Sequence, residues 1–242
     1  MLDSLLDKGR RERMVKILSA NPMVERGVAE VMRRIPRHLF VEKGLGHSAY
    51  DDKPLSISWG QTISQPSTVA VQTSLLGLKR GEKVLEIGTG CGYQTAVLEL
   101  LGGDVYSVER IAALHDIAGA NLKSIGCFGV KLFLADGNLG LPQYAPFDKI
   151  LVTCAAEEIP HELALQLSVG GKMVVPVVCG EDESRACRGT ENRFCGETRN
   201  RTCREAEKRE QQMMVVKRIS QTEYDVRNMG ACSFVPMLRG TV

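Results

Sequence analysis

The sequence predicts a doubly wound α/β fold, in which a mostly parallel sheet with an antiparallel edge follows an N-terminal helical subdomain. From residue 83 onward, short apolar runs alternate with stretches of helical periodicity, which is typical of parallel strands joined by helices. Beyond residue 211, strand-like runs follow one another too closely for a helix to fit between them, which favours an antiparallel edge. Before residue 36, apolar residues recur at helical spacing.

The composition narrows the class of protein. The chain has 242 residues, 43% of them apolar, which suits one α/β domain with small additions. The formal net charge of +2 argues against a nucleic-acid partner, because nucleic-acid-binding domains carry a clear basic excess. The charged N-terminus lacks the apolar core of a signal peptide, and no apolar run approaches the ~18 residues that span a bilayer. We therefore expect a cytoplasmic monomer with no membrane partner.

The N-terminal part is expected to hold two helices and a loop. Residues 2–18 alternate apolar and charged side chains at helical spacing. A second helix is expected to end at Ile35, with Asn21 as its cap and Pro22 at its first position. Residues 50–66 have no periodicity, which indicates an ordered loop of the kind that often carries chemistry.

Four parts of the chain are expected. Strands are predicted at 83–87, 104–108, 130–134, 147–152 and 172–178, and after these at 213–219, 224–227 and 231–236. Helices are predicted at 93–101, 111–125 and 160–167. The parts are 1–78 (N-terminal helices and substrate loop), 79–178 (cofactor-binding core), 179–210 (insertion) and 211–242 (strands that complete the sheet).

The insertion is a four-fold octad repeat, CGEDESRA, CRGTENRF, CGETRNRT and CREAEKRE. An eight-residue unit with so few apolar side chains cannot bury a core, so a solvated and flexible insertion is the favoured interpretation. The alternative is a thiol cluster that binds metal or responds to redox state. Zinc sites pair cysteines about two to four residues apart, and a spacing of eight residues does not match that pattern.

A glycine-rich turn predicts the cofactor site. The segment 84–92 reads VLEIGTGCG, follows a predicted strand and opens a predicted helix. Glycines at Gly88, Gly90 and Gly92 permit a sharp turn and a close approach to a ligand, with Thr89 between them and Glu86 two residues before. A dinucleotide fingerprint needs a third glycine at position 93, where tyrosine stands, which disfavours a nicotinamide dehydrogenase.

Acidic residues at two further strand ends identify the kind of cofactor. Glu109 ends the second strand of the core, where a carboxylate can accept hydrogen bonds from both ribose hydroxyls. Asp136 follows the third strand, where it can accept from an adenine amino group with the Gly137 backbone close to the ring. Together these features favour a nucleoside cofactor without a pyrophosphate, and S-adenosyl-L-methionine fits that description. The four histidines do not cluster with carboxylates along the sequence, and no metal site is expected.

At this point the sequence resembles the protein-L-isoaspartate (D-aspartate) O-methyltransferase family. The resemblance is carried by Gly60–Pro66 (GQTISQP), which is specific to that family, and by Val84–Gln94 (VLEIGTGCGYQ), which many methyltransferases share. It covers nearly the whole chain outside the octad repeat. Shorter matches are Ile35–Arg37, Phe40–Val41, Tyr50–Asp52, Pro54–Leu55, Ser107–Arg110, Pro146–Asp148, Gly170–Gly171 and Phe234–Pro236.

The resemblance implies a class I methyltransferase fold and a protein-repair activity. Methyl transfer from S-adenosyl-L-methionine, with S-adenosyl-L-homocysteine as product, would modify the free α-carboxylate of L-isoaspartyl residues in damaged proteins, with D-aspartyl residues as a candidate second acceptor. The ester would then collapse to a succinimide and hydrolyse in part to L-aspartate. The catalytic serine of the family matches Ser64, and the motif places Thr62 and Gln65 beside it as substrate-binding residues.

The residue types suit this chemistry. A carboxylate is already ionised at neutral pH, since its reference pKa is about 3.5 to 4, so no general base is required. What remains is alignment of the reacting atoms. Hydroxyl groups of Thr62 and Ser64 can hold a carboxylate without the strong ion pair that an arginine would form, so Ser64 is expected to position it. The competing interpretation is that both hydroxyls bond only to loop backbone.

The chain departs from the family pattern at two places, and two other functions stay open. The family usually has glycine near Ser58 and Gly-Asp-Gly where Ala135–Gly137 stands; Ser58-Trp59 is expected to alter the shape of the substrate loop, and Ala135 is a mild change. One alternative is another adenosylmethionine-dependent methyltransferase with a small-molecule or RNA acceptor, which would not need Gly60–Pro66. The other is a catalytically silent binding homologue.

Overall fold

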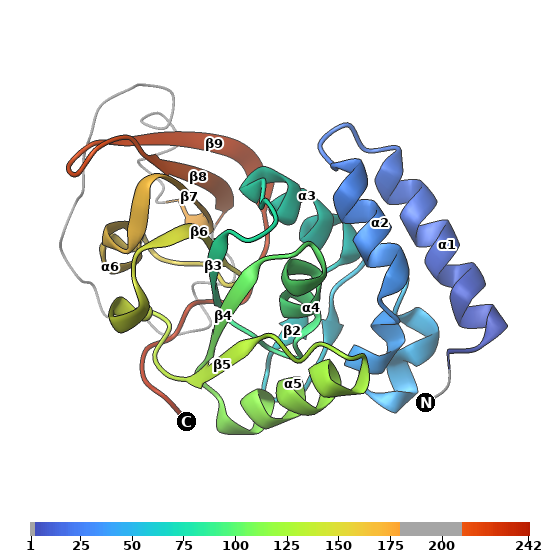
Figure 1. The fold of residues 1–242 in the computed structure, drawn as a ribbon. Helices are drawn as coiled ribbons and strands as arrows, with labels where there is room; N and C mark the ends of the chain where they lie inside the picture. Colours follow the sequence, from blue (N-terminus) through green and yellow to red (C-terminus); the bar gives the residue numbers. More distant parts are fainter. Residues whose placement is uncertain (1–2, 180–209) are drawn as a thin grey trace.

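The computed structural model describes residues 3–179 and 210–242. At its centre is a seven-stranded sheet in the order β5-β4-β3-β6-β7-β8-β9 (Figure 1). The first five strands in this order, from β5 through β4, β3 and β6 to β7, are parallel to one another. Strands β8 and β9 are antiparallel additions at the edge beyond β7. The predicted fold class is confirmed. The strands are β3 (Lys83–Ile87), β4 (Asp104–Glu109), β5 (Lys131–Leu134), β6 (Phe147–Val152), β7 (Leu167–Val178), β8 (Gln211–Arg218) and β9 (Tyr224–Cys232).

Successive side chains of each buried strand point to opposite faces of the sheet, so both faces are apolar. Helices cover both of them. On one face the strands pack against α3 (Pro66–Leu76) and α4 (Tyr93–Leu100) through Val84, Val105, Leu151 and Val174. On the other face, Leu85, Val108, Ile150 and Met173 pack with α6 (His161–Leu165). Helix α5 (Ala112–Ser124) contacts β4 and β5.

The N-terminal helices form an outer layer. Helices α1 (Leu5–Ser19) and α2 (Arg26–Arg34) pack against α3 and α4 (Figure 1). Helix α1 begins with a capping box, in which the Ser4 hydroxyl accepts from the Asp7 backbone N–H at 3.1 Å. Three short 3-10 helices complete the described helical segments: η1 (Arg37–Phe40), η2 (Lys43–Ser48) and η3 (Pro142–Tyr144). In the described ranges no helix is long and apolar enough to cross a membrane.

The second helix starts later than the sequence predicted. The Asn21 side chain accepts a hydrogen bond from the Met23 N–H at 2.9 Å and so closes a turn of its own. Helix α2 begins at Arg26, behind Glu25. The Asn-Pro pair therefore marks a turn and not a helix start.

Helix α3 was not predicted at all. Its buried side chains are both apolar and polar, so it lacks the amphipathic period that reveals a surface helix. Its polar groups are satisfied internally: the Gln72 amide donates to the Val152 carbonyl at 2.7 Å, and the Thr73 and Ser74 hydroxyls donate to carbonyls one turn earlier. The signals that could have revealed it are Pro66 at the first turn and Gly77, which ends the helix in the left-handed conformation.

The C-terminal strands also differ from the prediction. Strand β9 is continuous where two strands were expected, and the predicted strand at 231–236 is wrong beyond Cys232. The segment that follows lies along the carboxyl end of β6 instead. The Ala155 N–H donates to the Val235 carbonyl at 2.8 Å, and the Met237 N–H donates to the Ala155 carbonyl at 2.7 Å.

The loop at 50–66 contains a small hairpin, formed by β1 (Leu55–Ser56) and β2 (Thr62–Ile63). Its turn holds three successive residues with positive φ: Ser58 at 75°, Trp59 at 50° and Gly60 at 67°. This is the conformation that glycine adopts without a steric penalty. The turn thus keeps a glycine-type backbone although serine occupies the position where the resembled family usually has glycine.

The octad repeat lies outside the described residues except at its ends. Strands β7 and β8 pair directly, and the Cys179 N–H donates to the Glu210 carbonyl at 2.7 Å, so the repeat connects two neighbouring strands. Its flexibility and its thiol chemistry, like the division of the chain into four parts, stay predictions.

Candidate active site

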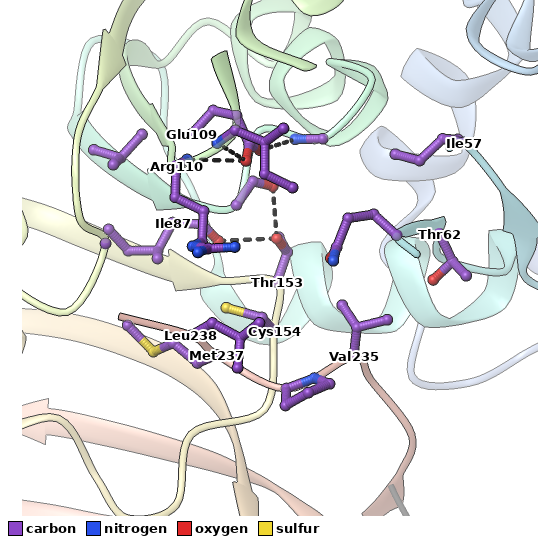
Figure 2. Close-up of a pocket in the computed structure, with 17 residues that line it drawn as sticks. Ile57, Thr62, Ile87, Glu109, Arg110, Thr153, Cys154, Val235, Met237 and Leu238 are labelled. Carbon is purple, nitrogen blue, oxygen red and sulfur yellow. Dashed lines mark hydrogen bonds between the residues drawn. The ribbon is translucent and has the colours of Figure 1, made fainter. Parts of the chain in front are cut away.

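The glycine-rich turn is folded tightly over the end of β4. The backbone N–H groups of Gly88 and Thr89 donate to the Val108 carbonyl at 2.9 and 3.2 Å. Thr153, at the end of β6, donates its hydroxyl to the carbonyls of Ile87 and Gly88 at 2.9 and 2.7 Å (Figure 2). A side chain at Gly88, where φ is +94°, would place its Cβ 2.4 Å from the Thr153 hydroxyl. Position 88 therefore requires glycine.

A cleft of about 610 Å³ opens beside this turn. It lies at the carboxyl ends of the parallel strands where the strand order reverses around β3, which is where doubly wound folds bind ligands. The lining residues come from distant parts of the chain (Figure 2): Ile57, Gln61, Thr62, Ile87, Gly88, Gly90, Val108–Ile111, Gly137, Thr153, Cys154 and Val235–Leu238.

Glu109 is the one carboxylate among the described residues that line this cleft. Its side chain is almost fully buried, and its Oε2 accepts from the Gly90 N–H at 2.8 Å. Its Oε1 accepts from the N–H groups of Arg110 and Ile111 at 2.9 and 3.0 Å. A carboxylate offers about four acceptor positions, so capacity remains for a ligand hydroxyl. Glu109 both holds the turn and lines the cleft.

Three of the predicted cofactor residues do not line the cleft and instead support the glycine-rich turn. Glu86 is fully buried, and its Oε2 accepts from the hydroxyls of Thr95 and Ser107 at 2.6 Å each. Thr89 shares a hydrogen bond of 2.6 Å with the Ser107 hydroxyl. Gly92, at φ +89°, is the N-cap of α4 and packs against α5. Burial raises the pKa of Glu86 to about 7, and the two hydroxyl donors only partly oppose that shift.

The end of β5 contributes Gly137 to the cleft but not Asp136. A Cβ on Gly137 would lie 2.5 Å from the Ile87 side chain. Asp136 accepts from Asn138 through Oδ1 and from the Gly240 N–H through Oδ2 at 2.7 Å. Burial alone would raise the pKa of Asp136, but these hydrogen bonds outweigh it and the pKa lies below its ordinary value. In this structure Asp136 anchors the C-terminal segment, and its adenine-binding role stays a prediction.

A second, smaller groove of about 390 Å³ adjoins the cleft. It brings together the three residues predicted to bind substrate, Thr62, Ser64 and Gln65. It shares Thr62, Thr153 and Val235 with the cleft, so the two cavities have a common wall. None of the lining residues that the structure describes carries a charge; the others are Pro54, Thr68, Ser233 and Phe234.

Sequence reasoning missed several lining residues. Thr153 follows β6, so the rule that picked out Glu109 and Asp136 at strand ends could also have found it. Val235–Leu238 gave no such signal, because only the pairing of Ala155 with this segment brings it over the cleft. Within the described ranges, no three His, Cys, Asp or Glu side chains gather as a potential metal site.

The fold and the paired cavities define a class I, adenosylmethionine-dependent type of methyltransferase. The family model described as Protein-L-isoaspartate(D-aspartate) O-methyltransferase (PCMT) matches residues 9–206. This chain is 41% identical over 238 residues to the protein-L-isoaspartate O-methyltransferase of Christiangramia forsetii, covering 98% of each chain. It is 44% identical over 236 residues to that of Methylobacillus flagellatus, covering 96% of this chain and 92% of the relative. The chain belongs to the protein-L-isoaspartate(D-aspartate) O-methyltransferase family.

Solved structures agree with this assignment. A protein-L-isoaspartate O-methyltransferase superposes with a TM-score of 0.73 at 27% identity, over 93% of this chain and 65% of that chain. A putative protein-L-isoaspartate O-methyltransferase from Plasmodium falciparum, solved with S-adenosyl-L-homocysteine, also gives a TM-score of 0.73, at 19% identity over 94% of this chain and 98% of that chain. The second similarity supports the fold.

Proposed function

We propose that this protein is a repair enzyme that methylates the free α-carboxylate of L-isoaspartyl residues in damaged proteins, with S-adenosyl-L-methionine as methyl donor and S-adenosyl-L-homocysteine as product. The observation that carries the proposal is the common wall of the two cavities, formed by Thr62, Thr153 and Val235. These shared residues place the cleft and the groove side by side, so a donor in the cleft and an acceptor in the groove would be neighbours. Membership of the family supports the identity of both.

The cleft suits a nucleoside cofactor with an amino-acid tail. Gly88, Gly90 and Gly137 expose backbone where side chains would fill the space, and Glu109 supplies an acceptor for hydroxyl groups. The C-terminal segment at 235–238 adds an apolar wall. When bound, the cofactor supplies a methyl group on an activated sulfonium. Glu86, Thr89 and Gly92 would act indirectly, by holding the turn in shape.

The groove suits a carboxylate that must stay reactive. Thr62, Ser64, Thr68 and Ser233 line it with hydroxyl groups, and among the described residues no lysine or arginine lines it. Hydroxyl donors orient a carboxylate, whereas an arginine clamp would hold the nucleophilic oxygens in a bidentate ion pair. The acceptor is ionised at neutral pH, so these residues need only align it and exclude water. We assign this positioning to Ser64, with Thr62 and Gln65 as further contacts.

The product leaves the enzyme as a methyl ester. The ester carbonyl is a better electrophile than a carboxylate, so the backbone nitrogen of the following residue attacks it, closes a succinimide ring and releases methanol without further catalysis. Hydrolysis of the ring returns part of the material to L-aspartate. D-aspartyl residues are a candidate second acceptor. We further propose that the enzyme works as a cytoplasmic monomer without a nucleic-acid or membrane partner, and the near-neutral charge of +2 supports the exclusion of nucleic acid.

The test is methyl transfer from labelled S-adenosyl-L-methionine to two short peptides that differ only in isoaspartate or aspartate at one position. We expect label in the isoaspartyl peptide alone. Cofactor binding without transfer to either peptide would favour the silent homologue, and transfer to an unrelated small molecule or RNA instead would favour the other alternative.

Ser64→Ala tests the role of the groove. Loss of one hydroxyl that orients the acceptor should lower kcat by about 10- to 100-fold, while the affinity for S-adenosyl-L-homocysteine stays within about twofold of wild type. Calorimetric titration and steady-state kinetics measure the two quantities. An equal loss of both would show that Ser64 supports the whole site and does not position the acceptor.

A further inference from the structure

Arg37 is a buried charge that the proposed chemistry does not use. It lies in η1, is 0% exposed, and is one of the largest fully buried side chains of the protein. Among the described residues no carboxylate forms an ion pair with its guanidinium, and its Nη1 has no hydrogen-bond partner. Burial of a charge without a counter-ion is costly, so its retention calls for a reason.

The guanidinium bonds to the two ends of the active-site loop. Its Nε donates to the Ala49 carbonyl at 2.8 Å, and its Nη2 donates to the Ser64 carbonyl at 2.7 Å. Ala49 directly precedes the loop, and Ser64 is the residue to which we assign orientation of the acceptor. The rigid, planar fork of an arginine fixes both carbonyls in one geometry.

The same side chain also touches the cofactor turn. Its Cζ lies 4.6 Å from the centre of the Tyr93 ring, a cation–π distance. Tyr93 is buried and is the first residue of α4, immediately after Gly92 of the glycine-rich turn. One side chain therefore contacts the loop that carries Ser64 and the helix that begins at the cofactor turn.

We propose that Arg37 is a positioning residue that fixes the Ser64 loop relative to the cofactor turn, so that acceptor and methyl donor are aligned. This inference rests on the proposed methyltransferase function. Alignment is the main task of this enzyme, and a misplacement of about 1 Å can cost about 100-fold in rate. Lysine cannot replace the fork, because it offers a point charge on a flexible stem.

Arg218 provides a matched control. It is 8% exposed, donates to the carbonyls of Leu165 and Leu167 at 2.9 and 2.6 Å, and lies 5.8 Å from the Tyr224 ring. It belongs to β8 and lines neither cavity. Its guanidinium also donates to Ser220 and Gln221, so Arg218→Lys disturbs at least as many contacts as Arg37→Lys, at a residue that lines neither cavity.

The experiment compares Arg37→Lys, Arg218→Lys and wild type in kcat, in KM for an isoaspartyl peptide and in unfolding midpoint. We expect Arg37→Lys to lower kcat by about tenfold or more with a smaller change in KM, and Arg218→Lys to lower the midpoint without lowering kcat. A kcat within twofold of wild type in Arg37→Lys would overturn the proposal, as would an equal loss of kcat in Arg218→Lys. If Arg37→Lys does not fold, Arg37→Gln is measured in the same way, since its planar amide keeps one donor.

Amide hydrogen exchange of residues 60–65 separates this proposal from the proposed function. We expect faster exchange there in Arg37→Lys than in wild type or in Arg218→Lys. Absence of methyl transfer in wild type would contradict the proposed function, and the exchange rates would still decide whether Arg37 holds the loop. Unchanged exchange in Arg37→Lys would reject its positioning role whatever the activity.

Discussion

At the scale of single residues, the carboxylates of the core strands have distinct tasks. Glu109 faces the cleft and holds the turn, Asp136 anchors the C-terminal segment, and Glu86 lies buried beneath the turn. All three stand near the carboxyl ends of parallel strands, so sequence position alone predicts a ligand contact equally for each of them. Their hydrogen-bond partners separate them.

Glu109→Gln tests the direct role. The amide keeps the shape of the side chain but removes the charge and one acceptor, so it can no longer serve both the turn and a ligand hydroxyl. We expect the affinity for S-adenosyl-L-homocysteine to fall by about 10- to 100-fold, measured by calorimetric titration. Unchanged affinity would remove Glu109 from the cofactor site.

Glu86→Gln tests the buried carboxyl through the pH dependence of stability. The folded-state pKa of about 7 lies above the ordinary glutamate pKa of 4.5, so the folded protein binds this proton more tightly than the unfolded chain does. The contribution of Glu86 to the free energy of unfolding is therefore fully present below about pH 4.5. It is lost as the pH rises to about 7, by a total on the order of 3 kcal/mol. Glu86→Gln should abolish that fall in urea unfolding experiments at pH 5 and pH 8. Parallel pH curves for variant and wild type would contradict the assignment.

Ser58→Gly tests the strained turn. A serine at φ 75° carries a penalty of about 1 kcal/mol that glycine does not, and the hydrogen bond from its hydroxyl to Glu42 is exposed and contributes less. We expect Ser58→Gly to raise the free energy of unfolding by about 0.5 to 1 kcal/mol. Ser56→Gly, in the extended strand β1, is the control and should lower it. Destabilisation by both changes would mean that the turn is not strained.

At the scale of elements, the C-terminal segment closes the cleft. Val235–Leu238 line it. The backbone N–H of Gly240 donates to the Asp136 carboxylate, and that of Val242 donates to the Arg110 carbonyl. These hydrogen bonds are made by residues that follow the lining segment. They can therefore be removed by a deletion that leaves residues 235–238 in place.

Deletion of residues 239–242 should therefore loosen the wall without removing it. We expect faster dissociation of S-adenosyl-L-homocysteine, by about tenfold, with little change in the unfolding midpoint. Stopped-flow displacement measures the rate. A dissociation rate equal to that of the full chain would show that the last residues do not retain the ligand.

At the scale of the whole molecule, the sequence revealed the parallel core and not the elements laid over it. Lys83–Ile87 and Phe147–Val152 were predicted to the residue, because a short apolar run between turns is a local signal. Helix α3 and the segment after Cys232 were missed, because both are determined by tertiary contacts: α3 is buried on several sides, and the segment pairs with Ala155.

The same division applies to the site. Gly88, Gly90, Glu109 and Gly137 were predicted from the rule that ligands bind at strand ends, and the structure gathers them in one cleft. Ser64, Thr62 and Gln65 came from family resemblance, and they share one groove. Arg37 stood within the short family match Ile35–Arg37, but its role was not predicted, since the role of a buried arginine is recognised only when the carbonyls that it bonds are seen.

The most direct test of the central claim follows an isoaspartyl peptide during incubation with the enzyme and S-adenosyl-L-methionine, with products separated by chromatography. We predict that a methyl ester forms first, that a succinimide replaces it, and that part of the peptide returns as the L-aspartyl form. Formation of S-adenosyl-L-homocysteine with no ester on the isoaspartyl peptide would contradict the claim, because the groove would then serve a different acceptor.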